Sequence, residues 1–213
     1  MEEAELSMRD DMEADQLSLR AVAPGLILIL LVDILTLCGF WPQQGWINHL
    51  LSLTLLSLPW VTLIVLRKPV RCLGYQRKDF LRIFGWGIVA GGFWRLLSII
   101  FNLWWVNLGG LDVAWISRIV GALIWIPLIE ETFFRGYLLR PLTTGIGVWP
   151  GILFQALFFT IQPVHWNQGG LALLSIFGFG LLAGWLQQHW DSIWPSWGAH
   201  AFANLLPMVV LFA

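Results

Sequence analysis

Residues 115–140 read WISRIVGALIWIPLIEETFFRGYLLR, and this stretch decides the class of fold. It is mostly apolar and lacks the strict alternation of apolar and polar residues that marks a strand of a membrane barrel. A helix needs about 20 such residues to cross the hydrocarbon core of a bilayer. Because a helix satisfies its own backbone polar groups, it is stable in lipid. The stretch therefore predicts a transmembrane helix.

Six further apolar runs and the overall composition indicate the same environment. Of the 213 residues, 58% are hydrophobic and only 12% are charged, and the mean hydropathy is +0.73. Soluble domains are closer to half apolar and a quarter charged. The further runs cover about 21–40, 47–66, 80–106, 149–166, 170–189 and 194–213. We therefore predict an all-α membrane protein, a polytopic bundle of about seven transmembrane helices with a buried polar site.

The expected division of the chain is a polar N-terminal tail over residues 1–20 and a single transmembrane helical domain over residues 21–213. The motif-bearing core of that domain is expected at about 115–213. The tail holds seven acids and two arginines, and it lacks the basic start of a signal peptide. Two glycine pairs spaced by four residues, Gly87/Gly91 and Gly180/Gly184, are expected to let neighbouring helices approach closely.

The distribution of charge predicts an orientation in the membrane. The net charge of −1 gives no sign of a nucleic-acid partner, but six lysines and arginines lie between residues 67 and 82. Short basic loops stay on the cytoplasmic side of a membrane. Two predicted spans precede this loop, so the N-terminus is expected on the same side. The expected location is a bacterial-type inner membrane or another internal membrane, with the lipid bilayer as a partner.

The densest group of charges inside an apolar run is Glu130, Glu131 and Arg135. A charge at the centre of a membrane helix costs at least about 2.5 kcal/mol, so such residues are candidates for function. Glu131 and Arg135 are spaced i,i+4 and can pair on one helix face. Glu130 lies about 100° away around a regular helix and has no partner on it. It is therefore a candidate general base, although a structural ion pair near a helix end is the alternative.

Three further polar residues lie in two other predicted spans. His165 ends the fifth span, and His200 and Asn204 are spaced i,i+4 on the seventh. A single membrane histidine is commonly an interfacial residue. A glutamate, two histidines and an asparagine that converge in one cavity could instead activate water. Glu130 would take the proton, a histidine would assist, and His200 with Asn204 would donate to a developing oxyanion.

These motifs resemble the family of CAAX proteases and bacteriocin-processing (Abi) proteins, known as CPBP. The resemblance rests on Glu130-Glu131-xxx-Arg135, on His165, and on His200-xxx-Asn204 preceded by Asp-Ser-Ile-Trp-Pro-Ser, and it covers about residues 125–206. It implies a glutamate-dependent intramembrane endopeptidase without a metal or other cofactor. The resemblance places water activation on Glu130 with support from Glu131 and Arg135, His165 beside the water, and His200 and Asn204 at the oxyanion.

The second motif departs from the family pattern. A phenylalanine usually stands four residues before the histidine, but this position is Ile161, and the nearest phenylalanine is Phe159. Depth is a second difficulty, because at about 1.5 Å per residue His165 lies more than about 20 Å into its span and His200 only about 10 Å. A break at Pro163, a tilted helix or different span boundaries would each bring the two histidines together.

The residues leave several functions open. The main prediction is hydrolysis of a peptide bond in a membrane-associated peptide or protein. A metal-dependent membrane hydrolase could use the same glutamate and histidines as ligands. A non-catalytic immunity factor, scaffold or assembly factor could use the polar cluster to bind a partner or hold helices together. A transporter would be supported by inverted repeats, which the sequence does not show. Asp33 and Arg95 also lie in the middle of predicted spans and could pair.

Overall fold

The described part of the chain consists of helices and their connections. The computed structural model describes residues 17–39, 45–76, 79–101 and 115–210, with no strand among them. Six helical runs are α2 (Leu19–Leu37), α3 (Gly45–Leu66), α4 (Phe80–Ile100), α8 (Val148–Thr160), α9 (Gly170–Trp190) and α10 (Trp194–Val210). The seventh is one continuous run made of α5 (Trp115–Val120), η2 (Gly121–Trp125), α6 (Ile126–Glu130), η3 (Glu131–Leu139) and α7 (Arg140–Ile146). This arrangement confirms the predicted all-α class.

Among the described residues, four helices are long and apolar enough to cross a membrane: α2, residues His49–Leu66 of α3, α4 and α9. The protein is therefore a membrane protein. Helix α2 begins at Leu19, two residues before the predicted start, because the Ser18 side chain caps it by accepting the Ala21 N–H at 3.3 Å. Residues 1–16 of the expected polar tail lie outside the described residues.

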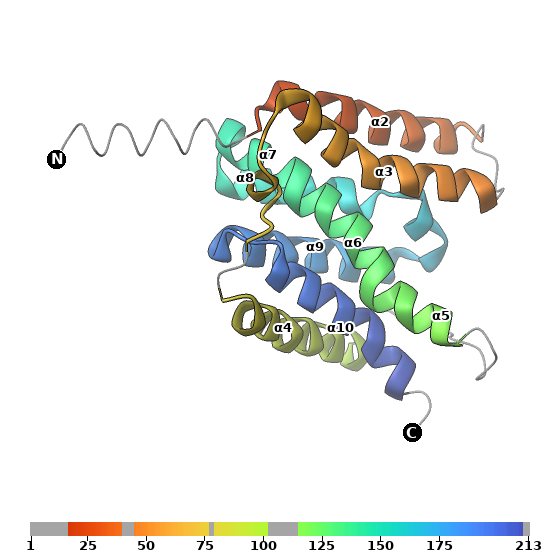
Figure 1. Ribbon diagram of the computed structural model, residues 1–213. Helices are drawn as coiled ribbons and strands as arrows, with labels where there is room; N and C mark the ends of the chain where they lie inside the picture. The colour runs from red at the N-terminus through yellow and green to blue at the C-terminus, as the bar shows by residue number, and fades with distance from the viewer. Residues whose placement is uncertain (1–16, 40–44, 77–78, 102–114, 211–213) are drawn as a thin grey trace.

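The continuous run from α5 to α7 crosses the middle of the bundle, with the α2–α3 pair on one side of it and the α4–α10 pair on the other (Figure 1). Helix α8 returns along α7 and packs against α9. All nine residues of η3 are buried, including Glu131 and Arg135. The stretch that carries the paired glutamates therefore lies in the centre of the fold.

Two stretches of this central run, η2 and η3, are π-helical. A π-helix has i→i+5 backbone hydrogen bonds and a wider turn than an α-helix, and it is frequent at functional sites. The change from α to π falls between Glu130, the last residue of α6, and Glu131, the first residue of η3. The sequence predicted a regular helix here, so the change from α-helix to π-helix was not expected.

Glycines bring α4 and α10 into close contact, as predicted for the first glycine pair. A Cβ atom at Gly87 or Gly91 would fall far inside contact distance of the carbonyl oxygens of Pro195 and Ala199, respectively. The second pair packs α9 on α8, since a Cβ at Gly180 would lie 3.0 Å from Ala156. Small residues replace side-chain contact by backbone contact in such interfaces. The α4 contact with Ala199 fixes the backbone next to His200.

The fifth helical run is shorter than predicted. Helix α8 ends at Thr160, and Pro163 begins the 3₁₀-helix η4 (Pro163–Gln168). Gln162, the residue before the proline, has an extended backbone, which α-helices do not accept. A 13-residue helix is about 20 Å long and cannot cross a hydrocarbon core of about 30 Å. The predicted span 149–166 is therefore wrong in its end point, and His165 lies beyond the break.

The connection between α3 and α4 is fastened to the turn between α9 and α10. It contains η1 (Val70–Leu73) and Gly74, whose carbonyl accepts the Ile193 N–H at 3.1 Å. Gln76 donates to the Asp191 backbone carbonyl at 2.6 Å and to its carboxylate at 2.8 Å. Arg140 pairs with the same carboxylate. These contacts hold the α3–α4 connection against the end of α10 that leads to His200.

Asp33 of α2 and Arg95 of α4 do not pair. Both side chains are buried, but neither carboxylate oxygen of Asp33 has a hydrogen-bond partner. Their helices lie on opposite sides of the central run (Figure 1), so the possible pairing considered from the sequence is wrong.

Candidate functional site

The candidate site is built around Glu131 at the start of η3. Its side chain is fully buried, and its Oε1 atom lies 3.2 Å from Nη1 of Arg135, one turn along the same helix. This ion pair confirms the partner expected from the i,i+4 spacing. A buried carboxylate needs such compensation, because burial of an unpaired charge is costly.

Two aromatic rings accompany the Arg135 guanidinium. Its central carbon lies 4.4 Å from the centre of the Phe159 ring and 5.9 Å from the centre of the Phe179 ring. A guanidinium over an aromatic face gains a cation–π attraction, which is larger where water is excluded. Arg135 is therefore held by one carboxylate and two rings, and it completes the charge balance behind Glu131.

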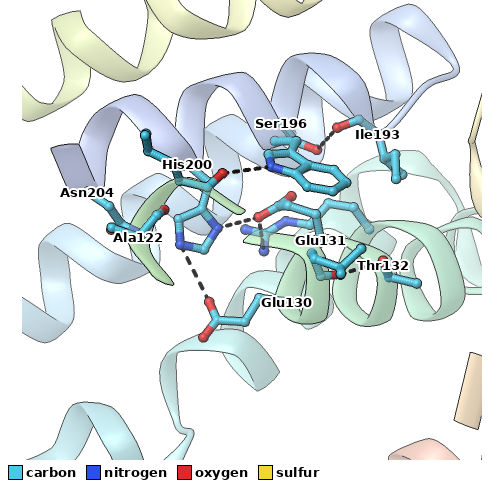
Figure 2. A network of polar contacts seen from close by, with 12 residues as sticks. Ala122, Glu130, Glu131, Thr132, Ile193, Ser196, His200 and Asn204 are labelled. Carbon is cyan, nitrogen blue, oxygen red and sulfur yellow. Dashed lines mark hydrogen bonds and ion pairs between the residues drawn. The ribbon is translucent and has the colours of Figure 1, made fainter. Parts of the chain in front are cut away.

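His200 of α10 lies between the two adjacent glutamates. Its Nδ1 atom is 2.7 Å from Oε1 of Glu131, and its Nε2 atom is 3.6 Å from Oε2 of Glu130 (Figure 2). The short contact requires a proton on Nδ1, because the carboxylate can only accept a hydrogen bond. The bond to Glu131 therefore orients the imidazole so that Nε2 faces Glu130. The hydrogen bond between His200 and Glu131 was not predicted from the sequence.

Glu130 and Glu131 differ in exposure although they are neighbours in the sequence. The Glu130 side chain is 21% exposed, whereas that of Glu131 is fully buried. The ion-pair partner of Glu130 within the described part of the chain is His200 of α10, with 3.6 Å between Oε2 and Nε2. Glu130 is thus the carboxyl group of the pair that water or a substrate can reach.

His165 reaches the same region from η4. Its Nδ1 atom lies 3.3 Å from the Thr160 carbonyl oxygen, and its ring is buried. The Phe159 ring makes edge contacts with both histidines, at 5.3 Å from His165 and 6.1 Å from His200 between ring centres. His165 also lies within electrostatic range of Glu130 and His200. Because α8 ends before Pro163, His165 can lie near His200, although regular upright helices would have placed the two histidines at different depths in the membrane.

The phenylalanine that contacts His165 is Phe159, not the residue at position 161, where the family pattern has a phenylalanine and this chain has Ile161. It stands six residues before His165 rather than four, but the turn and the 3₁₀-helix after Thr160 bring the two rings together. The Phe179 ring of α9 also contacts His200, with 5.3 Å between ring centres, and it lies 6.4 Å from the Phe159 ring. Phe179 was missed because an apolar side chain in an apolar span carries no signal in a single sequence.

Asn204 lies one helical turn after His200, as predicted, but it does not touch either glutamate. Its Nδ2 atom donates to the carbonyl oxygen of Ala122 in η2, at 3.4 Å (Figure 2). The structure thus gathers Glu130, His165 and His200 in one region and places Asn204 at its edge, on the α10 face that carries His200. The role expected for Asn204 at an oxyanion stays a prediction.

A metal site would need several histidine, cysteine, aspartate or glutamate side chains close together. In the described part of the chain, no group of three or more such side chains is arranged to hold a metal ion. The alternative of a metal-dependent hydrolase therefore has no ready-made ligand set within these residues.

Comparison with known proteins gives one match. The family model described as type II CAAX prenyl endopeptidase Rce1-like matches residues 112–206. The matched residues contain all three motifs, and they agree with the range of about 125–206 inferred from the motifs alone. The resemblance to the CAAX proteases is confirmed. No curated protein and no solved structure matches the chain.

Proposed function

We propose that this membrane protein, whose residues 112–206 match the Rce1-like family of type II CAAX prenyl endopeptidases, is a glutamate-dependent intramembrane endopeptidase. Its substrate would be a membrane-associated peptide or protein. The observation that carries the proposal is the imidazole of His200 between a buried and a partly exposed glutamate, with Arg135 behind them. A structural ion pair would need one carboxylate, whereas this site keeps a second one within reach of water.

In the proposed reaction Glu130 acts as the general base. It removes a proton from a water molecule, and the water oxygen attacks the carbonyl carbon of the peptide bond. His165, which lies in electrostatic range of Glu130, assists at the same water. The carbon–nitrogen bond then breaks, and the proton held by Glu130 passes to the leaving amine. The products are a carboxylate and a protonated amine, since the new carboxylic acid gives up its proton to the amine.

The oxyanion of the tetrahedral intermediate would be stabilised from α10. Glu131 fixes the Nδ1 side of His200, so a proton on Nε2 would point toward the region of Glu130. The Asn204 amide has a second N–H in addition to the one that contacts Ala122, and it lies on the same helix face. Donors that are fixed before the reaction stabilise a developing charge at little reorganisation cost.

A defined probe tests the proposal with the full chain in liposomes. The probe is an internally quenched peptide ending in a Cys-a-a-X motif, used farnesylated on the cysteine and unmodified. We expect cleavage by the wild type and a loss of about 100-fold or more for Glu130→Gln, the range that general-base catalysis contributes. Release of the three terminal residues, measured by mass spectrometry, locates the cleaved bond.

The arms of this experiment separate the alternatives. Cleavage of both probes by the wild type would show that the lipid is dispensable. Equal cleavage by wild type and Glu130→Gln would reject the glutamate mechanism, and loss of activity with a chelator would favour the metal-dependent hydrolase. If neither probe is cleaved, trapping of membrane polypeptides by Glu130→Gln in cells decides between another substrate and the non-catalytic scaffold. A cellular function that survives Glu130→Ala would support the scaffold.

A further inference from the structure

Tyr75, in the connection between α3 and α4, reaches the residue next to the buried glutamate. Its hydroxyl oxygen lies 2.5 Å from Oγ1 of Thr132, which is fully buried and follows Glu131 in η3. Thr132 is labelled beside Glu131 in Figure 2. Neither Tyr75 nor Thr132 is one of the glutamate, arginine, histidine and asparagine residues that define the three sequence motifs. Tyr75 also lies outside residues 112–206, which the family model matches.

The direction of these hydrogen bonds follows from counting protons. The Thr132 hydroxyl donates its only proton to the backbone carbonyl oxygen of Leu128, at 2.5 Å. Its oxygen can then only accept from Tyr75, so the Tyr75 hydroxyl is the donor. The result is a directed chain from Tyr75 through Thr132 to Leu128. It meets the central helix where α6 changes into the π-helical η3.

Tyr75 is itself firmly placed. Its ring packs against Trp60 of α3 and Trp194 of α10, with ring centres 5.5 Å and 5.4 Å away. The Trp194 indole donates to the Gln76 carbonyl at 2.5 Å. Burial raises the pKa of the Tyr75 phenol, so it stays a proton donor at neutral and moderately alkaline pH. The negative charge of Glu131 raises the pKa of this phenol further.

We infer that Tyr75 is a positioning residue: through Thr132 it holds the α-to-π junction, and with it the Glu130–Glu131 pair, in register with His200 of α10. The inference rests on the proposed function. Tyr75 contacts three elements, α3, η3 and α10, and two of these supply the site. A small rotation of the wide π-turn would move both carboxyl groups away from the imidazole, and misplacement of reacting groups is costly to the rate.

The test compares the two tyrosines of the chain. Tyr137 also donates a hydrogen bond from a phenol at η3, but to the Ala21 carbonyl on the α2 side, at 2.9 Å. With the farnesylated Cys-a-a-X probe, Tyr75→Phe is expected to lower kcat about fivefold to tenfold, the effect of one lost hydrogen bond, with KM unchanged. Tyr137→Phe, the matched control, is expected to keep kcat within about twofold of wild type.

Thr132 variants separate positioning from general stability. Thr132→Val should reproduce the loss of Tyr75→Phe, Thr132→Ser should restore activity, and Tyr75→Phe with Thr132→Val should be no worse than either alone. Equal kcat for Tyr75→Phe and Tyr137→Phe, or losses that multiply in the double variant, would overturn the inference. Wild type and Glu130→Gln are measured beside them. If Glu130→Gln cleaves as well as wild type, the proposed function fails rather than the role of Tyr75.

Discussion

At the scale of single residues, the adjacent glutamates have different surroundings. Glu131 is buried and bound to Arg135 and His200, whereas Glu130 keeps one side open. The spacing in the sequence predicted the Glu131–Arg135 pair, because neighbours on one helix are fixed by its geometry. It could not predict the bond from Glu131 to His200, which depends on how α10 is turned against η3. A single sequence does not show how one helix is rotated against another, and this rotation decides which side chains meet.

Arg135 offers a test of the buried ion pair. Arg135→Lys keeps the charge but loses the flat group that lies over Phe159 while it pairs with Glu131. We expect a loss of about 2 kcal/mol, or about 4–8 °C in Tm, and a drop in kcat of about tenfold or more. Thermal unfolding followed by tryptophan fluorescence measures the first effect. Arg82→Lys, at an exposed arginine, is the control, and an equally small change in both variants would contradict the prediction.

Asp33 allows a test of whether a buried acid outside the candidate site lowers the stability of the fold. It is 5% exposed, and neither carboxylate oxygen has a hydrogen-bond partner. Asp33→Leu should therefore raise Tm by about 2–4 °C, because an apolar side chain removes the cost of burying an unpaired acid. Asp33→Asn, which keeps the shape and a polar group, should gain less. A lower Tm for Asp33→Leu would show that the acid has a stabilising partner in the membrane-embedded protein.

At the scale of elements, the sequence predicted the existence of the helices well. It was less successful with their end points and with the change from α-helix to π-helix. Long apolar runs with clear borders predicted α2, α3 and α9 to within three residues at each end. The π-turns of the central run were not predicted, because an apolar run indicates a helix but not how its backbone is wound. Pro163 did signal a break, but only the structure shows that the break folds His165 back toward the other histidine.

Close packing of α4 on α10 can be tested with two glycines of the same helix. Gly91→Ala would place a methyl group against the Ala199 carbonyl oxygen, next to His200, whereas nothing lies within 4 Å of a Cβ at Gly85. We expect Gly91→Ala to lower Tm by about 5 °C or more and to reduce kcat with it. Gly85→Ala should be neutral or stabilising by up to about 1 kcal/mol, because alanine is the better helix former. Similar effects of both substitutions would reject the tight interface.

At the scale of the whole molecule, the remaining expectation concerns orientation. The basic loop predicts that the α3–α4 connection faces the cytoplasm. Helix α3 has 22 residues and is about 33 Å long, enough to cross the hydrocarbon core, so the ends of α3 should lie on opposite sides. Cys38 after α2 is exposed, and so is Val70 at the start of η1, while Cys72 is buried. These positions allow both sides to be labelled without removing a charge from the loop.

Two single-cysteine proteins, each without Cys72, decide the orientation: one keeps Cys38, and the other carries Val70→Cys with Cys38→Ser. A maleimide that cannot cross membranes should label Val70→Cys only when the cytoplasmic face is accessible and Cys38 only when the opposite face is. This labelling would place the Tyr75 connection and the basic loop on the cytoplasmic side of the membrane. Labelling of both positions from one side would reject α3 as a full span, and reversed labelling would reject the cytoplasmic orientation.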